Sequence, residues 1–412
     1  MKSLTTYARF IRENYTSIIV TTLMMGVIIG LSLKLFIRES EKKMRDKKVL
    51  FSILIIFLSG LVGTSLCIGN ETSLTLIYTS NNLGEVEPCG TCPDGGDNGG
   101  LPRRSHYLKT VKEEVKNLLV LDTGDALVVG YFSEPRGREQ ARRRAEFVLK
   151  LYETLGYHAL NIGDTDLGLG VGYLKDLQKK STIPFLSANL REKKTGKPVF
   201  KPYIIKEAGG IKIGILGLVT ADISPPIQKE LKDYFIDNPV KAAAETIRHI
   251  KPSCDHVIVL AHLTTLEIES LVRDVQPISI IIGGNDRSFV FPKQIGRSLY
   301  VQTDAFGIHV GRLNLNLLKG SYEFADVLSA RLIQKKIEEI QEKIEDPKHA
   351  QDLKGLKDLR DILIAQQKKI PGSEGKNRYE NYLVLMHPGM KSDLDIQRKI
   401  DASRDLLKRI LP

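Results

Sequence analysis

Between residues 74 and 317 the chain alternates continuous apolar runs with amphipathic segments. The apolar runs predict strands at Leu74–Thr79, Leu118–Leu121, Ala159–Ile162, Phe185–Ala188, Lys212–Leu218, His256–Leu260 and Ile278–Ile282. The amphipathic segments predict helices at Arg103–Lys116, Arg136–Leu155, Val171–Lys180 and Pro239–Ile250. Tyr300–Thr303 and His309–Leu317 predict antiparallel strands that close the sheet. Continuous apolar strands separated by helices are typical of an α/β fold whose sheet is buried on both faces.

Five of these apolar runs lead into a short block of polar residues. The blocks are Tyr78–Gly84, Asp122–Asp125, Gly163–Asp166, Leu260–His262 and Gly283–Arg287. Open α/β sheets bind ligands at the carboxyl ends of their strands, where such blocks would meet. Any one block has an ordinary explanation, since Asp is common in turns and a Gly-Gly pair often marks one. Only the ordered set indicates a functional site.

Beyond Tyr322 the pattern becomes helical. Residues 330–345 and 353–363 carry apolar positions at helical spacing, and Asp346-Pro347 separates them, so they predict an antiparallel helical hairpin. Its apolar stripe fits packing within the protein, or a protein partner docking at 330–365. A strand at Tyr382–Met386 and a helix at Leu394–Leu411 are predicted to follow and to pack back on the main domain.

The N-terminus carries two apolar stretches, Ile18–Phe36 and Val49–Ile68, with a Lys- and Arg-rich loop between them. Each approaches the length of about 20 residues that crosses a bilayer as a helix. The basic loop would then be cytoplasmic and the globular part would lie on the extracytoplasmic, periplasmic side. Alternatively, the basic residues from Met44 and the second stretch form a secretory signal. Both interpretations export the globular part, either membrane-anchored or secreted.

These patterns divide the chain into four segments. They are a membrane-anchor or signal region (1–68), a main domain (69–322), the hairpin (323–378) and a terminal strand and helix (379–412). The formal net charge of the 412 residues is +11, but the basic excess lies in tails and helices. Because aromatic and basic residues do not interleave, no nucleic-acid partner is expected.

The cysteines bear on redox chemistry. In an oxidising compartment, Cys89 and Cys92 could form a tight disulfide or act as a redox couple. Pro93 follows them where a c-type haem site requires His. The chain has no second CxxC, so a four-cysteine zinc site is not supported.

In this order the five blocks resemble those of the UshA-type 5'-nucleotidase branch of the calcineurin-like metallophosphoesterases. Connecting segments are similar too, among them Leu186–Asn189, Phe200–Tyr203, Ile213–Thr220 and Val301–Gly307. The resemblance extends from about Leu74 to Leu317 and implies a four-layer α-β-β-α sandwich. It also implies a metal-dependent phosphoric ester hydrolase with two divalent ions bridged by a carboxylate.

The resemblance implies that one of the two metal sites is lost. In the family, the first block supplies an Asp and a His to one ion, and Asn81 and Leu83 stand at these positions. Leucine cannot coordinate a metal, and neutral Asn is a much weaker ligand than a carboxylate. In the fifth block, Arg287 takes the place of a further ligand, and a guanidinium repels a cation. Arg287 could instead occupy the vacated position and pair with Asp125, or bind an anion.

The second metal site keeps more of its ligands. The resemblance assigns to it Asp125, which is the bridging carboxylate, together with Asp164, His262 and Asn285. This set implies one divalent transition-metal ion (Mn, Fe or Zn), or none. Thr165 stands where the family has its catalytic His, so no catalytic residue is assigned.

The loop after the first block carries Cys89 and Cys92 and leads to Arg103 and Arg104. It is similar to an UshA-like subgroup with a Glu-Pro-Cys-Gly-Cys loop and a Gly-Gly-Leu-x-Arg-Arg segment. The two cysteines fit a structural disulfide, a redox pair or soft metal ligands. The two arginines fit bidentate contacts to an anion, or solvated charge at the start of a helix.

Two functions follow from these observations. The first is an exported, membrane-tethered protein with a degenerate dinuclear centre, weak or lost phosphoesterase activity, and a binding or thiol-redox role. The alternative is a functional hydrolase of phosphate (nucleotide-like) or sulfur esters that uses one retained metal site.

Overall fold

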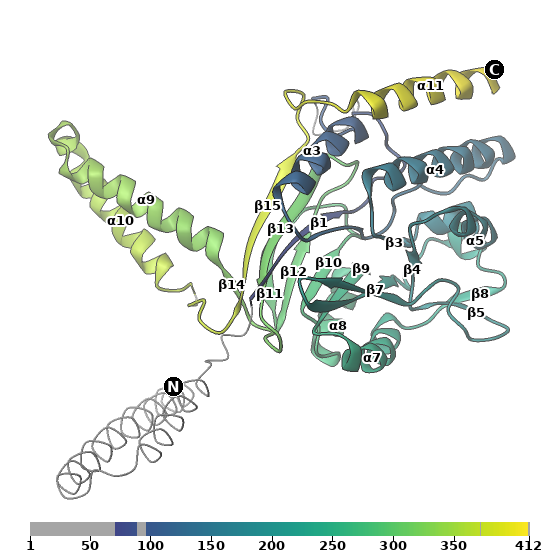
Figure 1. The fold of residues 1–412 in the computed structure, drawn as a ribbon, viewed down its shortest axis with the longest axis horizontal. Coiled ribbons are helices and arrows are strands. Elements are labelled where there is room, and N and C mark those ends of the chain that lie inside the picture. Colours follow the sequence, from purple (N-terminus) through teal and green to yellow (C-terminus); the bar gives the residue numbers. More distant parts are fainter. Residues whose placement is uncertain (1–70, 89–95, 371, 411–412) are drawn as a thin grey trace, which may run out of the picture. The chain divides into compact units, whose positions relative to one another are not determined.

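The computed structural model describes residues 71–88, 96–370 and 372–410, which lie in one compact unit, Gly69–Pro412 (Figure 1). The apolar stretches predicted to cross a membrane or form a signal, and both cysteines of the CxxC pair, lie outside the described residues. Within the described ranges, no helix is long and apolar enough to span a bilayer.

Two mixed β-sheets form the centre of the unit. The first sheet has the order β14 (Phe324–Asp326), β15 (Asn377–Leu385), β13 (His309–Leu317), β1 (Thr72–Thr79), β2 (Leu118–Asp122), β3 (Ala159–Asn161) and β4 (Phe185–Leu186). The second has the order β11 (Val290–Ile295), β12 (Ser298–Gln302), β10 (Ile280–Gly283), β9 (His256–His262), β7 (Ile211–Val219) and β6 (Tyr203–Ala208). A small third sheet pairs β5 (Leu190–Glu192) with β8 (Tyr234–Ile236).

Helices cover the outer face of each sheet (Figure 1). On the first sheet lie α3 (Leu101–Glu114), α4 (Pro135–Leu155) and α5 (Val171–Lys180), and α11 (Leu394–Ile410) packs against α3. On the second lie α7 (Pro239–Ile250) and α8 (Thr265–Asp274). Short helices complete the path at α6 (Pro225–Gln228), η1 (Asp166–Leu169) and η2 (Lys251–Ser253).

Three layers of apolar side chains separate these four layers of backbone. One lies between the two sheets and joins Leu76 of β1 to Ile215 of β7 and Ile258 of β9. The other two lie between each sheet and its helices. The α-β-β-α arrangement follows because both faces of each sheet are apolar, which matches the continuous apolar strands of the sequence.

The structure corrects the prediction that Tyr300–Thr303 and His309–Leu317 are antiparallel strands closing one sheet. β12 runs parallel to β10, with Ile281 opposite Tyr300, and β13 lies in the other sheet, antiparallel to β1. The hairpin of β11 with β12, which the prediction lacked, reverses the chain before β12 and so brings it back parallel to β10. Helix α8 was also missed, although Thr264 and Glu267 form a capping box at its start.

The predicted helical hairpin is present as α9 (Val327–Glu345), η3 (Pro347–Asp352) and α10 (Leu353–Gln367). It is inserted between β14 and β15, which pair with each other in the first sheet. Arg331 of α9 contacts β15 through an ion pair with Glu380 at 3.0 Å. Leu332, Leu359 and Ile362 remain exposed on the hairpin. A protein partner for this surface stays a prediction.

Candidate metal centre

The polar blocks meet where the carboxyl ends of β1, β2 and β3 in one sheet approach those of β9 and β10 in the other. Parallel pairing of β1 with β2, β2 with β3 and β9 with β10 aligns these strand ends within each sheet. Thr123 then joins the two sheets, because its hydroxyl donates to the carbonyl of Gly283 at 3.1 Å. The side chain of Asn81 makes a second link by donating to the carbonyl of Gly284.

Three of the predicted ligands come together there. Nε2 of His262 lies 2.9 Å from Oδ1 of Asp164 and 3.5 Å from Oδ2 of Asp125. Ligand atoms about 2.1 Å from one ion lie roughly 3.0 Å apart in octahedral and 3.4 Å apart in tetrahedral coordination. The separations in the cluster therefore suit a single divalent ion, and the set of two carboxylates and one imidazole suits a transition metal.

Asp125 and His262 are buried and Asp164 is half-buried, and their charges act strongly on one another. Burial alone would lower the pKa of His262, but the carboxylates of Asp125 and Asp164 outweigh it and raise the pKa to about 10. Burial opposes ionisation of Asp125 too, yet the charge of His262 holds the pKa of that carboxyl below its ordinary value. The positive charge of the protonated His262 imidazole thus offsets the negative charge of the carboxylates of Asp125 and Asp164. A bound metal cation would offset this negative charge in its place.

The backbone makes room for the Asp125 carboxylate. Asp125 itself adopts a left-handed conformation with φ of 54°, which is uncommon for a residue with a side chain. Gly163 packs against this carboxylate, and a Cβ at position 163 would collide with Oδ1 of Asp125. A Cβ on Gly124 would come within 2.8 Å of the Gly163 nitrogen. The two glycines are therefore required for the carboxylate to face Asp164 and His262.

Asp166, which the sequence argument did not select, holds this arrangement in place. Its carboxylate accepts hydrogen bonds from the backbone nitrogens of Asp125 at 2.9 Å, Leu127 at 3.0 Å and Gly163 at 3.1 Å. Burial and the nearby Asp125 charge raise the pKa of Asp166 to about 8. The position of Asp166 in the third block is the one feature of the sequence that could have drawn attention to it. Its role depends on contacts between loops that only the fold brings together.

Thr165 is occupied by structural contacts. Its backbone nitrogen donates to Oδ1 of Asp125 at 2.9 Å, and its hydroxyl donates to the carbonyl of Val128 at 3.0 Å. Asn285 lies half-buried in the loop after β10, without a hydrogen bond to the cluster. The three-residue cluster is accordingly the part of the predicted set that the structure assembles.

Asn81, Leu83 and Arg287 stand at the positions that the resemblance matches to a first metal site. Leu83 is buried at 1% exposure, and the amide nitrogen of Asn81 is used on Gly284, which leaves the buried Oδ1 of Asn81 without a partner. The proposed pairing of Arg287 with Asp125 is wrong, because Arg287 is exposed and the partners of the Asp125 carboxylate are His262 and Thr165. The loop after β10 carries the guanidinium outward, with φ of 55° at Arg287.

Arg103 and Arg104 are neither solvated nor open to an added anion. Arg104 is 1% exposed; it donates to Asn82 Oδ1 at 2.8 Å and to the hydroxyls of Tyr157 at 3.1 Å and Tyr152 at 3.2 Å. Arg103 pairs with Asp97 at 2.8 Å and donates to nearby carbonyls. Arg104 is thus buried in a network with Tyr152 and Tyr157, and Arg103 is buried against Asp97, Gly99 and Met386, which consecutive arginines in a sequence do not reveal.

Comparison with known proteins gives relatives of one kind. No family model matches the sequence. A snake venom 5'-nucleotidase from Gloydius brevicauda is 27% identical over 285 residues, which cover 60% of this chain and 47% of that protein. A 2',3'-cyclic-nucleotide 2'-phosphodiesterase/3'-nucleotidase from Salmonella typhimurium is 29% identical over 180 residues, covering 40% of this chain and 27% of that protein. The chain therefore spans less than half the length of these curated relatives.

Solved structures agree on the fold. The calcineurin-like phosphoesterase YfkN from Bacillus subtilis superposes with a TM-score of 0.59 and 16% identity, covering 83% of this chain and 100% of that one. The sulfate thiohydrolase SoxB from Thermus thermophilus gives a TM-score of 0.59 and 15% identity over 80% of this chain and 60% of that one. The sequence relatives are thus 5'-nucleotidases and a 2',3'-cyclic-nucleotide 2'-phosphodiesterase/3'-nucleotidase, and the structural neighbours show that the chain has the fold of the calcineurin-like phosphoesterases.

Proposed function

We propose that the chain holds one divalent transition-metal ion (Mn, Fe or Zn) between Asp125, Asp164 and His262. The observation that carries this proposal is that two carboxylates from separate loops converge on His262 at the end of strand β9. Oδ1 of Asp164 lies 2.9 Å and Oδ2 of Asp125 lies 3.5 Å from Nε2 of His262. Gly163 supports it, because the absence of a side chain there leaves space for the Asp125 carboxylate. A left-handed backbone at Asp125 is the kind of strain that persists at functional sites.

We propose further that two-metal phosphoester hydrolysis is weak or lost. A divalent ion at the cluster supplies Lewis-acid polarisation of an ester oxygen. The chain's own residues orient this site: Asp166 holds the main chain of Asp125, and Asp164 contacts His262. The hydroxyl of Thr165 is engaged with Val128, so that position offers no proton to a leaving group. With Leu83 buried and Arg287 turned outward, a second ion has no ligand set.

The expected role is then binding at the inherited cleft, or thiol chemistry at Cys89 and Cys92. The alternative is a hydrolase that works with one ion, and the names of the relatives suggest its substrates. Nucleotide-like phosphate esters follow from the 5'-nucleotidases, and sulfur esters from the sulfate thiohydrolase of similar fold. The hydrolase requires the metal, whereas thiol chemistry at Cys89 and Cys92 does not, so the metal is tested first.

The purified full chain is expected to contain about one equivalent of a transition metal by inductively coupled plasma mass spectrometry. The affinity for the metal ion should increase by up to about tenfold per pH unit between pH 6 and pH 8. The reason is that the ion must displace the proton on His262, whose pKa is raised to about 10. Turnover of adenosine 5'-monophosphate, bis(4-nitrophenyl) phosphate and an organic thiosulfate should be weak, and a disulfide-reduction assay tests the thiol role.

Each outcome of this experiment decides between the functions. Chelator-sensitive, rapid turnover with one equivalent would establish the one-metal hydrolase instead. Two equivalents of metal would contradict the loss of the first site. No bound metal at either pH would refute the proposed centre.

We also propose that the globular part lies outside the cytoplasm, tethered or exported through Ile18–Phe36 and Val49–Ile68, whose apolar character motivates the proposal. Protease added to intact spheroplasts should digest a C-terminal epitope tag while a cytoplasmic control protein survives. Digestion only after lysis would place the globular part inside and contradict the proposal.

A further inference from the structure

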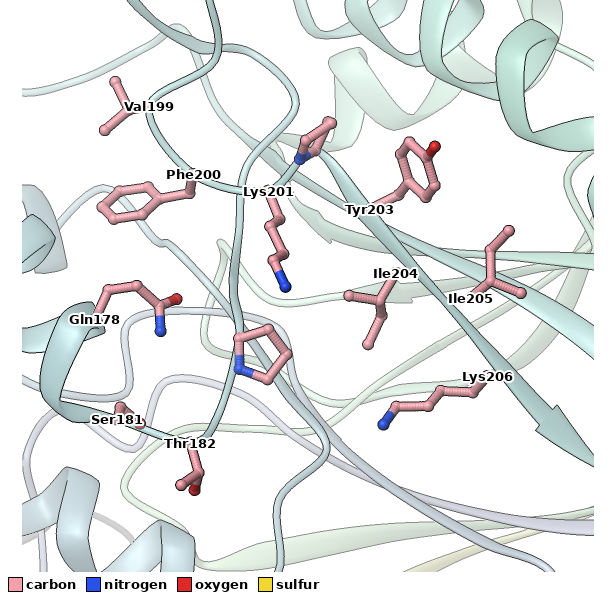
Figure 2. A pocket seen from close by; sticks show the side chains of 12 residues that line it. Gln178, Ser181, Thr182, Val199, Phe200, Lys201, Tyr203, Ile204, Ile205 and Lys206 are labelled. Carbon is pink, nitrogen blue, oxygen red and sulfur yellow. The ribbon is translucent and has the colours of Figure 1, made fainter.

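A large groove lies away from the metal cluster, along the outer edge of the second sheet (Figure 2). It has a volume of about 960 Å³, and none of its lining residues belongs to the candidate centre. One wall is strand β6 with the segment before it, and the other is the turn between α5 and β4. The groove therefore calls for an explanation separate from phosphoester chemistry.

The β6 wall presents unpaired backbone groups to this groove. β6 is the last strand of its sheet and pairs only with β7 among the described strands. Because Pro202 accepts from Gly217, the alternation of an antiparallel ladder turns the N–H and C=O groups of Tyr203, Ile205 and Glu207 to the free side. An edge of this kind is a template for a further strand.

Pairing on this free side has already begun one residue before the strand. The carbonyl of Lys201 accepts from the backbone nitrogen of Ser187 at 3.0 Å, and Leu186 forms a parallel bridge with Lys201. The chain then turns away, and Ala188 pairs with Gly217 instead. The edge is thus geometrically competent for strand pairing and remains open beyond Lys201.

The groove is also positively charged. Lys201 and Lys206 have no ion-pair or hydrogen-bond partner within the described ranges, and Figure 2 shows both side chains extending into the space beside Ile204. Burial, followed by the charges of Lys206 and Lys112, lowers the pKa of nearby His158. At the opposite wall, Ser181 and the nitrogen of Thr182 (at 2.7 Å) donate to Glu153, and neither lysine forms an ion pair with that carboxylate. An incoming carboxylate would therefore meet unneutralised ammonium groups.

We propose that this groove binds an extended, acidic peptide segment of a partner protein, which adds as a strand to the free edge of β6. Main-chain hydrogen bonds to Tyr203, Ile205 and Glu207 would provide affinity, as in other cases of strand addition. Alternate side chains of the peptide would face the groove, with apolar ones on Ile204 and acidic ones on Lys201 and Lys206. The two lysines would set the preference for acidic over basic segments.

The probe is an N-acetylated octapeptide of alternating valine and glutamate, mixed with the full chain. Hydrogen exchange measured by mass spectrometry should slow about fivefold or more in fragments that cover residues 203–208, because their outward amides become bonded. A valine–lysine octapeptide and a valine–glutamate octapeptide with N-methylated valines should give no protection. The first lacks the charge and the second lacks the donors.

Variants separate charge from backbone pairing. Lys201→Glu combined with Lys206→Glu should weaken binding by about tenfold or more, and Ile205→Pro, which removes an outward N–H, should abolish it. Lys229→Glu is the matched control, because Lys229 is exposed on the surface outside the groove, and it should leave the dissociation constant unchanged.

Three results would overturn the proposal. They are the absence of protection at millimolar peptide, equal binding of the basic peptide, and an unchanged affinity in the double lysine variant. Lysine-dependent binding of phosphatidylglycerol vesicles without peptide binding would assign the surface to a membrane instead, and would equally reject the peptide.

Discussion

Asp125→Ala is expected to reduce bound metal from about one equivalent to below about 0.1. Asp125 is 2% exposed and supplies one of only two carboxylates in the cluster, so its loss removes both a ligand and half of the negative charge that attracts the ion. The pKa of His262 should also fall toward its ordinary value, since the Asp125 charge is the largest of the interactions that raise it. Metal analysis by mass spectrometry and thermal unfolding with and without added Mn²⁺ measure the first effect, and an NMR pH titration of the His262 imidazole measures the second.

Two further variants serve as controls for the effect of Asp125→Ala on metal binding. Asp233→Ala changes an exposed carboxylate in a loop remote in sequence from the blocks, and should retain the wild-type metal content. Asp164→Asn keeps an oxygen ligand but removes its charge, so it should retain metal with weaker affinity. A folded Asp125→Ala protein that still holds a full equivalent would contradict the assignment of the site.

Arg104→Met is expected to lower the free energy of unfolding by about 3–5 kcal/mol. Methionine fills part of the volume but donates no hydrogen bonds, so Asn82 Oδ1 and the hydroxyl oxygens of Tyr152 and Tyr157 lose their shared donor. Tyr152 also donates a hydrogen bond to the buried carboxylate of Asp122 at 3.2 Å. Burial raises the pKa of Asp122 to about 6, although the charge of Arg104 acts to lower it. Urea denaturation followed by circular dichroism measures the loss.

Arg248→Met provides the comparison for this variant. Arg248 is exposed on α7, so its replacement should change the free energy of unfolding by less than about 0.5 kcal/mol. An equally small change for Arg104→Met would mean that the buried network contributes little, and that packing alone holds α3 and α4 against the first block. Reduced metal content in Arg104→Met at a temperature where it is folded would show that the network also orients the strand-end loops.

The elements that the sequence predicted well share a simple cause. Strands β1, β2, β7 and β9 are apolar on both faces and begin and end within one residue or two of the predicted positions. Helices α4, α5 and α7 show one apolar face at helical spacing, and their predicted bounds agree as closely. The spacing of apolar residues along the chain reflects which faces of an element are buried. Strands buried on both faces and helices buried on one face can therefore be recognised from the local sequence.

The missed elements lack such a local signal. Five of the six residues of β6 and all six of β11 are exposed or half-buried, because each strand lies at the edge of the second sheet. Their pairing depends on β7 and β12, which supply the hydrogen bonds that fix the register. An edge strand has a weak apolar pattern for the same reason that it can accept a partner.

The same division applies to the candidate centre. The resemblance of the ordered blocks to the metallophosphoesterase family selected Asp125, Asp164 and His262, and this was possible because a strand and the loop at its carboxyl end are neighbours in the chain. The blocks also revealed that Leu83 cannot bind a metal. The direction of Arg287, the burial of Arg104 and the supporting role of Asp166 could not be obtained in this way.

The amino-acid sequence by itself determined the α/β class, the order of the strand-end blocks and the identity of the three candidate ligands. Only the tertiary structure decided which polar groups meet, since the contacts of Asp164 with His262 and of Arg104 with Tyr152 join residues 98 and 48 positions apart. Local preferences act over a few residues, whereas burial and charge compensation depend on all the chain that packs around a group. For this reason Arg103 and Arg104, which look like surface residues in the sequence, are buried in the protein. Arg287, which could have filled the vacated metal position, is exposed.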